Sequence, residues 1–350
     1  MLAAQVGGPG GLVVTEVPLP KPGDGEMLVR VGAASICGTD LRILQNGLPG
    51  VSQAAPRILG HEFAGDVAEV GKGVSGIKPG DRVAVAPNIG CGHCDMCTSG
   101  KSHHCGSHSA IGITLDGGFA EYVLIPKEAV AQGNVIALPP GMTYPEASIA
   151  EALACCWHGF EACRISPGEV GLVIGAGPIG VAHSLIMRMA GASCVVMADI
   201  SQSRLDLAAS FGPDVTVNSA TESLEAVIHH ITGGKGADVV IVACPSPEAQ
   251  AQALTVAGVG GRINYFGGLP QRTLPVALDT NLIHYKELIV TGTTRSNTRQ
   301  FRMALRLIET GRFPARRLVT GTYPLSEAPS AFEAAASGRH MKVVIEPGGH

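Results

Sequence analysis

The sequence contains few charged and few aromatic residues. Asp, Glu, Lys and Arg make up 15% of the 350 residues, aromatic residues make up 4%, and the formal net charge at pH 7 is −4. No run of Lys and Arg occurs, so the chain lacks the basic surface with which proteins bind nucleic-acid phosphates. The hydrophobic share of 45% also excludes a disordered chain, because such chains are poor in Val, Leu and Ile. We expect a folded protein with no nucleic-acid partner.

Long hydrophobic segments and targeting signals are also missing. The most apolar part, residues 170–200, is interrupted by glycines, Pro178, Arg188 and Asp199, so it is a poor candidate for a membrane span. The first residues, MLAAQVGGPGGLVV, lack the basic start and long apolar stretch of a signal peptide. We therefore expect a cytoplasmic protein with no membrane partner. In that compartment disulfides are rare, and clustered cysteines indicate metal binding.

Two patterns of secondary structure follow each other along a chain that is long enough for about two domains. Up to about residue 150, short β-like segments such as EMLVRVGAA and DRVAVAP are separated by Gly and Pro. From about 165 to 295, strand-like segments such as VGLVIGAG alternate with helix-like segments such as PIGVAHSLIMRMAG. This alternation predicts βαβ units in a parallel sheet with helices on both faces. We expect the last fifty residues, which end in the strand-like MKVVIEP, to return to the N-terminal domain.

A glycine motif follows the first strand of the βαβ region. Gly175, Gly177 and Gly180 have the G-x-G-x-x-G spacing, and Asp199 ends the next predicted strand. Glycines allow a tight turn, close approach of a diphosphate and close packing of the helix, whose amides face the diphosphate. Asp199 would accept hydrogen bonds from a ribose and repel a 2′-phosphate, which favours NAD over NADP, although the nearby Arg204 weakens this preference. The alternative is a turn that only packs a helix. The expected cofactor-binding residues are Gly175, Gly177, Pro178, Ile179, Gly180, Asp199 and Arg204.

Four cysteines lie close together between residues 88 and 108. The spacing C-x2-C-x2-C-x7-C joins Cys91, Cys94, Cys97 and Cys105. Four thiolates can surround one tetrahedral Zn²⁺ with no open position, as in a structural site. A C-x-x-C redox motif would need only two cysteines, and a nucleic-acid-binding zinc module would bring more basic residues than Lys101. The spacing therefore predicts a structural zinc.

A second metal site is suggested by residues that lie far apart in the sequence. SICGTD contains Cys37, LGHEFAG contains His61 and Glu62, and SIAEALACC contains Glu151. A catalytic zinc keeps one position open for water or substrate. Each signal is weak alone, since a cysteine among strands usually packs in the core. Together with the four cysteines and the glycine motif, they predict a catalytic zinc.

These motifs together resemble the zinc-dependent medium-chain dehydrogenase/reductase superfamily, and within it the polyol (sorbitol) dehydrogenases and the related threonine dehydrogenases. The resemblance covers nearly the whole chain and includes CGTD, GHEFAGDVAEVGKGV, KPGDRVAV, the four cysteines, GGFAEY, VIGAGPIG and MKVVIEP. It implies an α/β protein with a β-rich GroES-like catalytic domain, 1–155 with 296–350, which carries the structural zinc lobe at 88–108. It also implies a Rossmann domain, a doubly wound parallel sheet, at 156–295, and a homodimer or homotetramer.

The resemblance also implies how the catalytic zinc acts. Cys37 and His61 would bind it, and Glu62 or Glu151 would complete the site, directly or through water. The zinc would lower the pKa of a secondary hydroxyl of the substrate, which would give a hydride to NAD and become a ketone. With the structural zinc, two zinc ions per chain are expected.

Proton release departs from the pattern of the family. Thr39 resembles the hydroxyl that carries the proton away from the alcohol. The histidine that often continues this relay is replaced by Arg42, which cannot act as a base. Our hypothesis is that the proton passes from Thr39 to water, either directly or through the ribose of the cofactor. Arg42 would instead face the diphosphate of the cofactor or a phosphate of the substrate.

The expected substrate is a small polyol of the sorbitol type, because the glutamate at 151 is typical of polyol dehydrogenases. L-threonine 3-dehydrogenase is an alternative, since CGTD occurs there too, and a polyol phosphate or an aminocyclitol is another. A zinc-free reductase of the same fold should lack Cys37, His61 and the four cysteines. A non-enzymatic alternative is a zinc-stabilised protein that binds a nucleotide only as a structural ligand.

Overall fold

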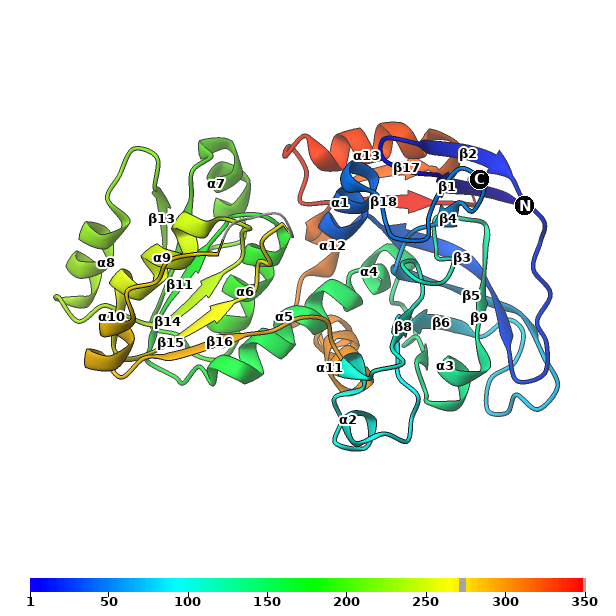
Figure 1. Cartoon of the computed structure of the whole chain (residues 1–350), viewed down its shortest axis with the longest axis horizontal. Coiled ribbons are helices and arrows are strands. Elements are labelled where there is room, and N and C mark those ends of the chain that lie inside the picture. Colours follow the sequence, from blue (N-terminus) through cyan, green and yellow to red (C-terminus); the bar gives the residue numbers. More distant parts are fainter. Residues whose placement is uncertain (271–274, 349–350) are drawn as a thin grey trace. The chain divides into compact units, whose positions relative to one another are not determined.

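The computed structural model describes residues 1–270 and 275–348. These residues form two compact units, Met1–Ala154 with Arg295–His350 and Cys155–Thr294 (Figure 1). Each boundary lies one residue from the domain boundary predicted from the sequence. The chain leaves the first unit within helix α5 (Ala150–Cys163).

The first unit is built on β-sheets. Its strands are β1 (Leu2–Val6), β2 (Leu12–Glu16), β3 (Met27–Ser35), β4 (Arg57–Ile58), β5 (Glu62–Val70), β6 (Arg82–Val85), β7 (Asn88–Ile89), β8 (Ser109–Ala110), β9 (Tyr122–Ile125), β10 (Val135–Ala137), β17 (Val319–Pro324) and β18 (Lys342–Glu346). The largest sheet has the order β10–β6–β5–β3–β18–β17, and β9 also pairs with β3. A second sheet has the order β2–β1–β4, and β7 pairs with β8. Because β18 pairs with β3, the C-terminal residues belong to this sheet.

Short helices connect and cover these strands. They are α1 (Gly38–Asn46), α2 (Asp95–Thr98), α3 (Lys127–Ala131), α4 (Tyr144–Ser148), α11 (Thr298–Glu309), α12 (Ala315–Leu318) and α13 (Ala328–Ala336), with the 3-10 turns η1 (Ser102–His104) and η2 (Leu325–Glu327). Helix α13 lies along β17 and β18 in Figure 1. Its Phe332 packs into the same core as Phe63 and Phe119, so the helix closes one face of the sheet.

The register of three neighbouring strands brings distant parts of the sequence together. Ser35, at the end of β3, pairs with Glu62 at the start of β5 and with Val344 in β18. Side chains of directly paired residues point to the same face of a sheet, and so do residues two apart on one strand. Lys342 lies two residues before Val344. The register therefore places Ser35, Glu62 and Lys342 on one face.

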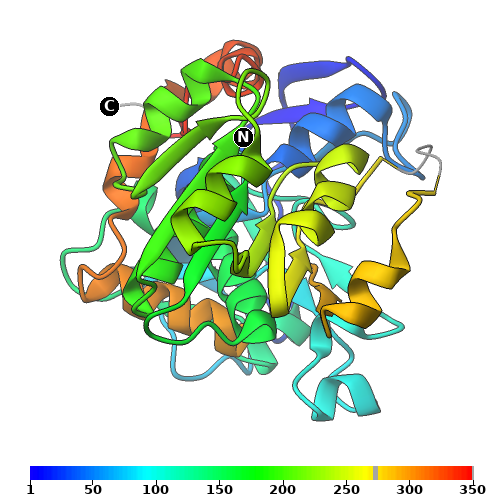
Figure 2. The same cartoon turned by 90° about the vertical axis from the view of Figure 1, so that its left-hand side faces the viewer.

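The second unit contains a parallel sheet covered by helices. Its elements are β11 (Val170–Ile174), α6 (Pro178–Met189), β12 (Cys194–Asp199), α7 (Gln202–Ala209), β13 (Val215–Asn218), α8 (Leu224–Thr232), β14 (Ala237–Val242), α9 (Pro247–Val256), β15 (Ala257–Tyr265), α10 (Thr280–Tyr285) and β16 (Ile289–Gly292). The strand order is β13–β12–β11–β14–β15–β16, and all pairs are parallel (Figure 2). The order reverses direction between β11 and β14, and this is the point at which such sheets bind ligands.

Both faces of the parallel sheet are buried. Leu172 and Ile174 of β11 pack into one core, whereas Val173, between them, packs with Met187 of α6 into the other. Alternate residues of one strand thus serve two helix layers, which explains why the strand reads as a continuous apolar run. The doubly wound parallel sheet predicted from the sequence is confirmed.

Within residues 1–270 and 275–348, no helix combines the length and the apolar composition needed to cross a membrane.

Candidate functional site

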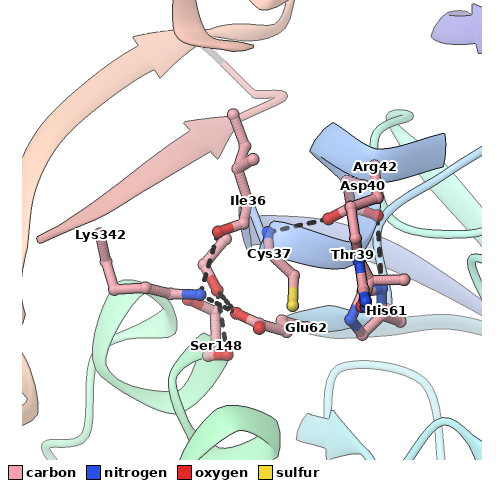
Figure 3. A network of polar contacts seen from close by, with 10 residues as sticks. Ile36, Cys37, Thr39, Asp40, Arg42, His61, Glu62, Ser148 and Lys342 are labelled. Atoms are coloured by element: carbon pink, nitrogen blue, oxygen red, sulfur yellow. Dashed lines mark hydrogen bonds and ion pairs between the residues drawn. The ribbon is translucent and has the colours of Figure 1, made fainter. Parts of the chain in front are cut away.

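Cys37, His61 and Glu62 form a cluster whose possible ligand atoms all lie within 4.8 Å of one another (Figure 3). Cys37 is the N-cap of α1, and His61 directly precedes Glu62, the first residue of β5. His61 and Glu62 are buried, and Cys37 is partly exposed. The pairing of β3 with β5 brings the ends of these elements together, so residues about 25 positions apart in the sequence share one site.

Asp40 orients two members of this cluster. Its Oδ2 accepts a hydrogen bond from the backbone N of Cys37 at 2.9 Å, and its Oδ1 lies 3.4 Å from Nδ1 of His61. Burial would lower the pKa of His61, but the charges of Asp40 and Cys37 raise it well above its usual value. A carboxylate behind the imidazole is the usual partner of a metal-binding histidine, because it fixes the orientation of the ring. Sequence reasoning missed Asp40, although the aspartate three residues after an N-cap is a capping signal.

The buried polar atoms of the cluster fit a divalent cation. Glu62 Oε1 is buried without a hydrogen-bond partner among the described residues, whereas Asp40 Oδ1 and His61 Nδ1 face each other, and burying an unpaired polar atom is costly. Three groups that can carry negative charge, Cys37, Asp40 and Glu62, meet here, and the positive groups beside them are Lys342 and His61. The unpaired oxygen favours a cation, and a thiolate with an imidazole and a carboxylate suits zinc.

The carboxylate of Glu62 is held by two donors. Burial would raise the pKa of Glu62, but the charges of Lys342 and His61 outweigh it and lower the pKa below its usual value. Lys342 Nζ and Ser35 Oγ both donate to Glu62 Oε2. Sequence reasoning also missed Lys342, and only the strand register could have indicated it.

Glu151, the other expected ligand, lies in the first turn of α5 and is buried. It is not in the group of ligand atoms within 4.8 Å of one another. The structure therefore brings Glu62 to Cys37 and His61 more closely than Glu151.

Thr39 and Arg42 contact each other on the first turn of α1. Nη2 of Arg42 donates a hydrogen bond to Oγ1 of Thr39 at 3.1 Å. Thr39 is partly exposed and Arg42 is exposed. Because the oxygen accepts from Arg42, the hydroxyl hydrogen of Thr39 is directed elsewhere. Residues three apart on a helix are neighbours, so the spacing of Thr39 and Arg42 is a signal that could have indicated this contact.

The four cysteines of the lobe face one another. The Sγ atoms of Cys91 and Cys97 are 4.0 Å apart, and those of Cys94 and Cys105 are 3.7 Å apart. Zn–S bonds of about 2.3 Å in a tetrahedron give S···S separations of about 3.8 Å. The sulfur atoms thus have the spacing that one zinc requires, with no position left for a substrate.

Backbone amides favour negative charge in this lobe. The amides of Cys91 and Ser107 donate to Sγ of Cys105 at 3.3 and 3.4 Å. Hydrogen bonds from the amides of His93 and Cys94 lower the pKa of the Cys91 thiol to about 6. Donors aimed at sulfur atoms stabilise thiolates, which are the form that binds zinc.

The lobe also anchors the segment that precedes α11. Nη1 of Arg295 donates to the carbonyl of His103 at 3.0 Å. Nδ2 of Asn297, the N-cap of α11, donates to the carbonyl of Gly100 at 2.7 Å. The fold of the cysteine loop thereby fixes where the chain re-enters the first unit.

The glycine motif forms the turn between β11 and α6. Gly175 has φ +115, which favours glycine. A Cβ on Gly180 would lie 1.8 Å from the carbonyl oxygen of Gly175, whereas a Cβ on Gly177 would meet no protein atom within 4 Å. Gly180 is thus required by packing, and Gly177 faces open space before Pro178 and Ile179 begin α6. Open space at the start of the helix suits a bound diphosphate.

Asp199 lies at the end of β12, beside this turn. Its Oδ2 accepts from the amide of Ala176 at 2.7 Å, and its Oδ1 accepts from the amide of Ser201 at 2.9 Å. Each carboxylate oxygen can accept a further hydrogen bond. Burial lowers the pKa of Arg204, and Asp199 partly offsets this effect. The two amides hold the carboxylate where the sequence analysis expects a ribose.

Comparison with known proteins shows the family. Residues 23–137 match the model of the alcohol dehydrogenase GroES-like domain, and residues 178–310 match that of the zinc-binding dehydrogenases. The chain therefore belongs to the zinc-dependent medium-chain dehydrogenases of the alcohol dehydrogenase superfamily, as the motifs predict. It is an enzyme that oxidises CH–OH groups with NAD or NADP, and its β-rich unit is the GroES-like domain.

Three similar proteins indicate the range of the family. The L-threonine 3-dehydrogenase of Bacillus subtilis (strain 168) is 37% identical over 341 residues, which are 96% of this chain and 95% of that protein. A zinc-binding dehydrogenase of Sinorhizobium meliloti 1021, solved with NADP, is 33% identical, with a TM-score of 0.90 and 99% of both chains covered. Galactitol-1-phosphate dehydrogenase of Escherichia coli is 28% identical, with a TM-score of 0.89 and coverage of 99% of this chain and 100% of that one.

The two glycines of the turn should respond differently to an added methyl group. Gly180→Ala should destabilise the protein by about 1–3 kcal/mol, because the new Cβ collides with the backbone of Gly175. Gly177→Ala should keep the melting temperature but weaken NADH binding, since the methyl group would occupy the space for the diphosphate. Thermal melting and NADH fluorescence titration measure both effects. If Gly177→Ala bound NADH as tightly as the wild type, the space at Gly177 would not be the diphosphate site.

Loss of one lobe cysteine should remove one zinc ion. Cys97→Ser should lower the zinc content from two ions per chain to one and lower the melting temperature, because a structural zinc contributes directly to folding. Elemental analysis by mass spectrometry measures the content. Cys194→Ser is the matched control, since Cys194 lies in β12 outside both ligand groups. Two zinc ions in Cys97→Ser would show that the lobe is not a zinc site.

Proposed function

We propose that this protein oxidises the secondary alcohol of a 3-hydroxy amino acid, with L-threonine as the first candidate, and that it uses NAD and a zinc ion held by Cys37, His61 and Glu62. The observation that carries the reaction is the cluster of a thiol, an imidazole and a carboxylate whose ligand atoms lie within 4.8 Å of one another, with Oε1 of Glu62 buried and unpaired. Three protein ligands leave one position of a tetrahedral zinc for a substrate. The similarity to L-threonine 3-dehydrogenase over 96% of the chain supports the substrate.

The polyol substrate expected from the sequence has weaker support. That expectation depended on the glutamate at position 151, which is typical of polyol dehydrogenases, and Glu151 does not belong to the cluster. The relatives then favour L-threonine.

The residues of the site have distinct proposed roles. When bound, the zinc would lower the pKa of the substrate hydroxyl and NAD would accept the hydride. Asp40 holds the amide of Cys37 and faces the ring of His61, so both ligands are oriented before any ion binds. Thr39 Oγ1, which accepts from Arg42, would also accept the hydrogen of the substrate hydroxyl on its second lone pair and pass its own hydrogen on to water. Because Arg42 cannot take up a proton, the proton would leave through water.

Arg42 also supports a second candidate, a polyol phosphate. Its guanidinium is exposed and next to Thr39, and guanidinium groups bind carboxylates and phosphates with two hydrogen bonds. An anionic group is common to both candidates: L-threonine carries a carboxylate, and galactitol 1-phosphate, named for a structural relative, carries a phosphate.

For the cofactor we propose NAD. The carboxylate of Asp199 is held beside the glycine turn by two amides, and its charge would repel the 2′-phosphate of NADP. The S. meliloti relative was solved with NADP, so both cofactors belong in the assay.

We also propose that the chain forms a homodimer or homotetramer. The last strand of the parallel sheet, β16, has no partner on its outer side among the described residues. Val259, Tyr285 and Ile289 near this edge are 78%, 78% and 54% exposed, and exposed apolar edges favour association. Sedimentation velocity measures the number of chains, and a monomer would contradict the proposal.

A substrate panel tests the proposed reaction. With NAD, L-threonine should give a higher kcat/KM than D-threonine, sorbitol or xylitol, and NADP should be the poorer cofactor. The absorbance of the reduced cofactor measures each rate. Turnover of galactitol 1-phosphate without L-threonine would favour the second candidate. NADH binding without oxidation of any alcohol would support the non-enzymatic alternative.

Replacement of Arg42 tests anion recognition. Arg42→Gln should raise the KM for L-threonine about tenfold or more, because a hydrogen bond to a charged group contributes about 1.5–3 kcal/mol. The KM for a neutral alcohol such as 2,3-butanediol should stay unchanged. Gln45→Ala, at another exposed position of α1, is the matched control. An equal rise for both substrates would exclude anion binding by Arg42.

A further inference from the structure

A buried lysine lies behind the proposed metal cluster. Lys342 is the first residue of β18, and its side chain is only 4% exposed. Its Nζ donates to Oε2 of Glu62 and, at 3.0 Å, to the carbonyl oxygen of Ile36. In Figure 3 the Glu62 carboxylate lies between Nζ of Lys342 and Sγ of Cys37. The lysine thus contacts the side of Glu62 opposite to the cluster.

The two carboxylate oxygens of Glu62 have different surroundings. Oε2 accepts from both Lys342 and Ser35. Oε1 is buried and has no hydrogen-bond partner among the described residues. A carboxylate that served only as the counterion of a lysine would have no need to leave one oxygen unpaired, because an unpaired buried oxygen is costly. The unpaired oxygen has a use if a cation binds between Glu62, Cys37 and His61.

A buried ion pair is also a poor means of stabilising a fold. Removing two charges from water costs free energy that their attraction often does not return, and apolar residues of similar size pack as well or better. Lys342 sits among strands whose other buried positions, such as Val343 and Val344, are apolar. The pair at Lys342 and Glu62 therefore has a reason other than stability.

We propose that Lys342 is a positioning residue for the metal centre: it holds Oε2 of Glu62 and leaves Oε1 as the oxygen directed toward the ion between Cys37 and His61. Ser35 assists by donating to the same oxygen. The charge of Lys342 also offsets part of the negative charge of Cys37, Asp40 and Glu62, which lets three anionic groups share one buried site. The inference rests on the proposed metal site, and its test does not depend on the substrate.

The test measures metal binding rather than turnover. The full-length protein, with zinc kept in the four-cysteine lobe, is titrated with Co²⁺, whose visible absorption reports its ligands. Lys342→Met should weaken Co²⁺ binding about 10–100-fold, the usual loss when the partner of a metal ligand is removed, and should change the spectrum. Lys342→Arg should keep most of the affinity, because a guanidinium can still donate to Glu62.

A double variant separates positioning from charge balance. Glu62→Gln combined with Lys342→Met removes both charges, so its melting temperature should exceed that of Lys342→Met alone, while Co²⁺ binding stays weak. If the double variant regained both the melting temperature and the Co²⁺ affinity of the wild type, the proposal would be overturned, because Lys342 would then only neutralise a buried charge. Wild-type Co²⁺ affinity and spectrum in Lys342→Met would overturn it as well.

Two further variants, Ser35→Ala and Cys37→Ser, are measured in the same Co²⁺ titration. If Lys342→Met does not fold, Ser35→Ala removes a donor from the same oxygen without leaving a charge unpaired; it should lower Co²⁺ affinity and shift the spectrum, and an unchanged spectrum would refute the proposal. Cys37→Ser in the same titration tests the metal site itself. If Cys37→Ser bound Co²⁺ as the wild type does, the proposed metal site would be refuted. If the wild-type protein did not oxidise L-threonine, only the proposed substrate would be refuted.

Discussion

The proposed metal site depends on charged groups that are buried where β3, β5 and β18 meet. Asp40 and Glu62 are almost fully buried, Cys37 lies beside them, and Lys342 supplies one positive charge. Such a cluster is stable only when cations balance it. The chain supplies positive charge from Lys342 and His61, and we propose that a zinc ion supplies the rest.

Strand register, rather than any local motif, creates this cluster. Ser35 faces Glu62 on one side and Val344 on the other, so three segments from the beginning and the end of the chain contribute to one face. A shift of one residue in β18 would turn Lys342 to the opposite face and leave Glu62 without its counterion. Pairing of the last strand with β3 is therefore part of the site and not only of the fold.

The sequence predicted the features that are local and missed those that depend on register. The cysteines at 91, 94, 97 and 105 and the glycine turn are each contained in a short segment, so their spacing alone indicates their geometry. The choice between Glu62 and Glu151 depends on how far the first turn of α5 lies from Cys37 and His61, which spacing does not reveal. Lys342 lies 280 residues from Glu62, and no pattern in MKVVIEP shows that its lysine points inward.

The two metal sites use opposite means to hold negative charge, and this difference follows from their tasks. In the cysteine lobe, backbone amides donate to the sulfur atoms and four thiolates around a zinc ion would leave no open position, so the ion and the backbone donors would offset most of the negative charge. In the cluster at Cys37, a lysine and a serine occupy one oxygen of a single carboxylate. A site with three protein ligands needs other residues to orient those ligands from the side away from the metal, because the side toward the substrate is open. A closed site can rely on its loop, whereas an open site needs the rigid register of a sheet.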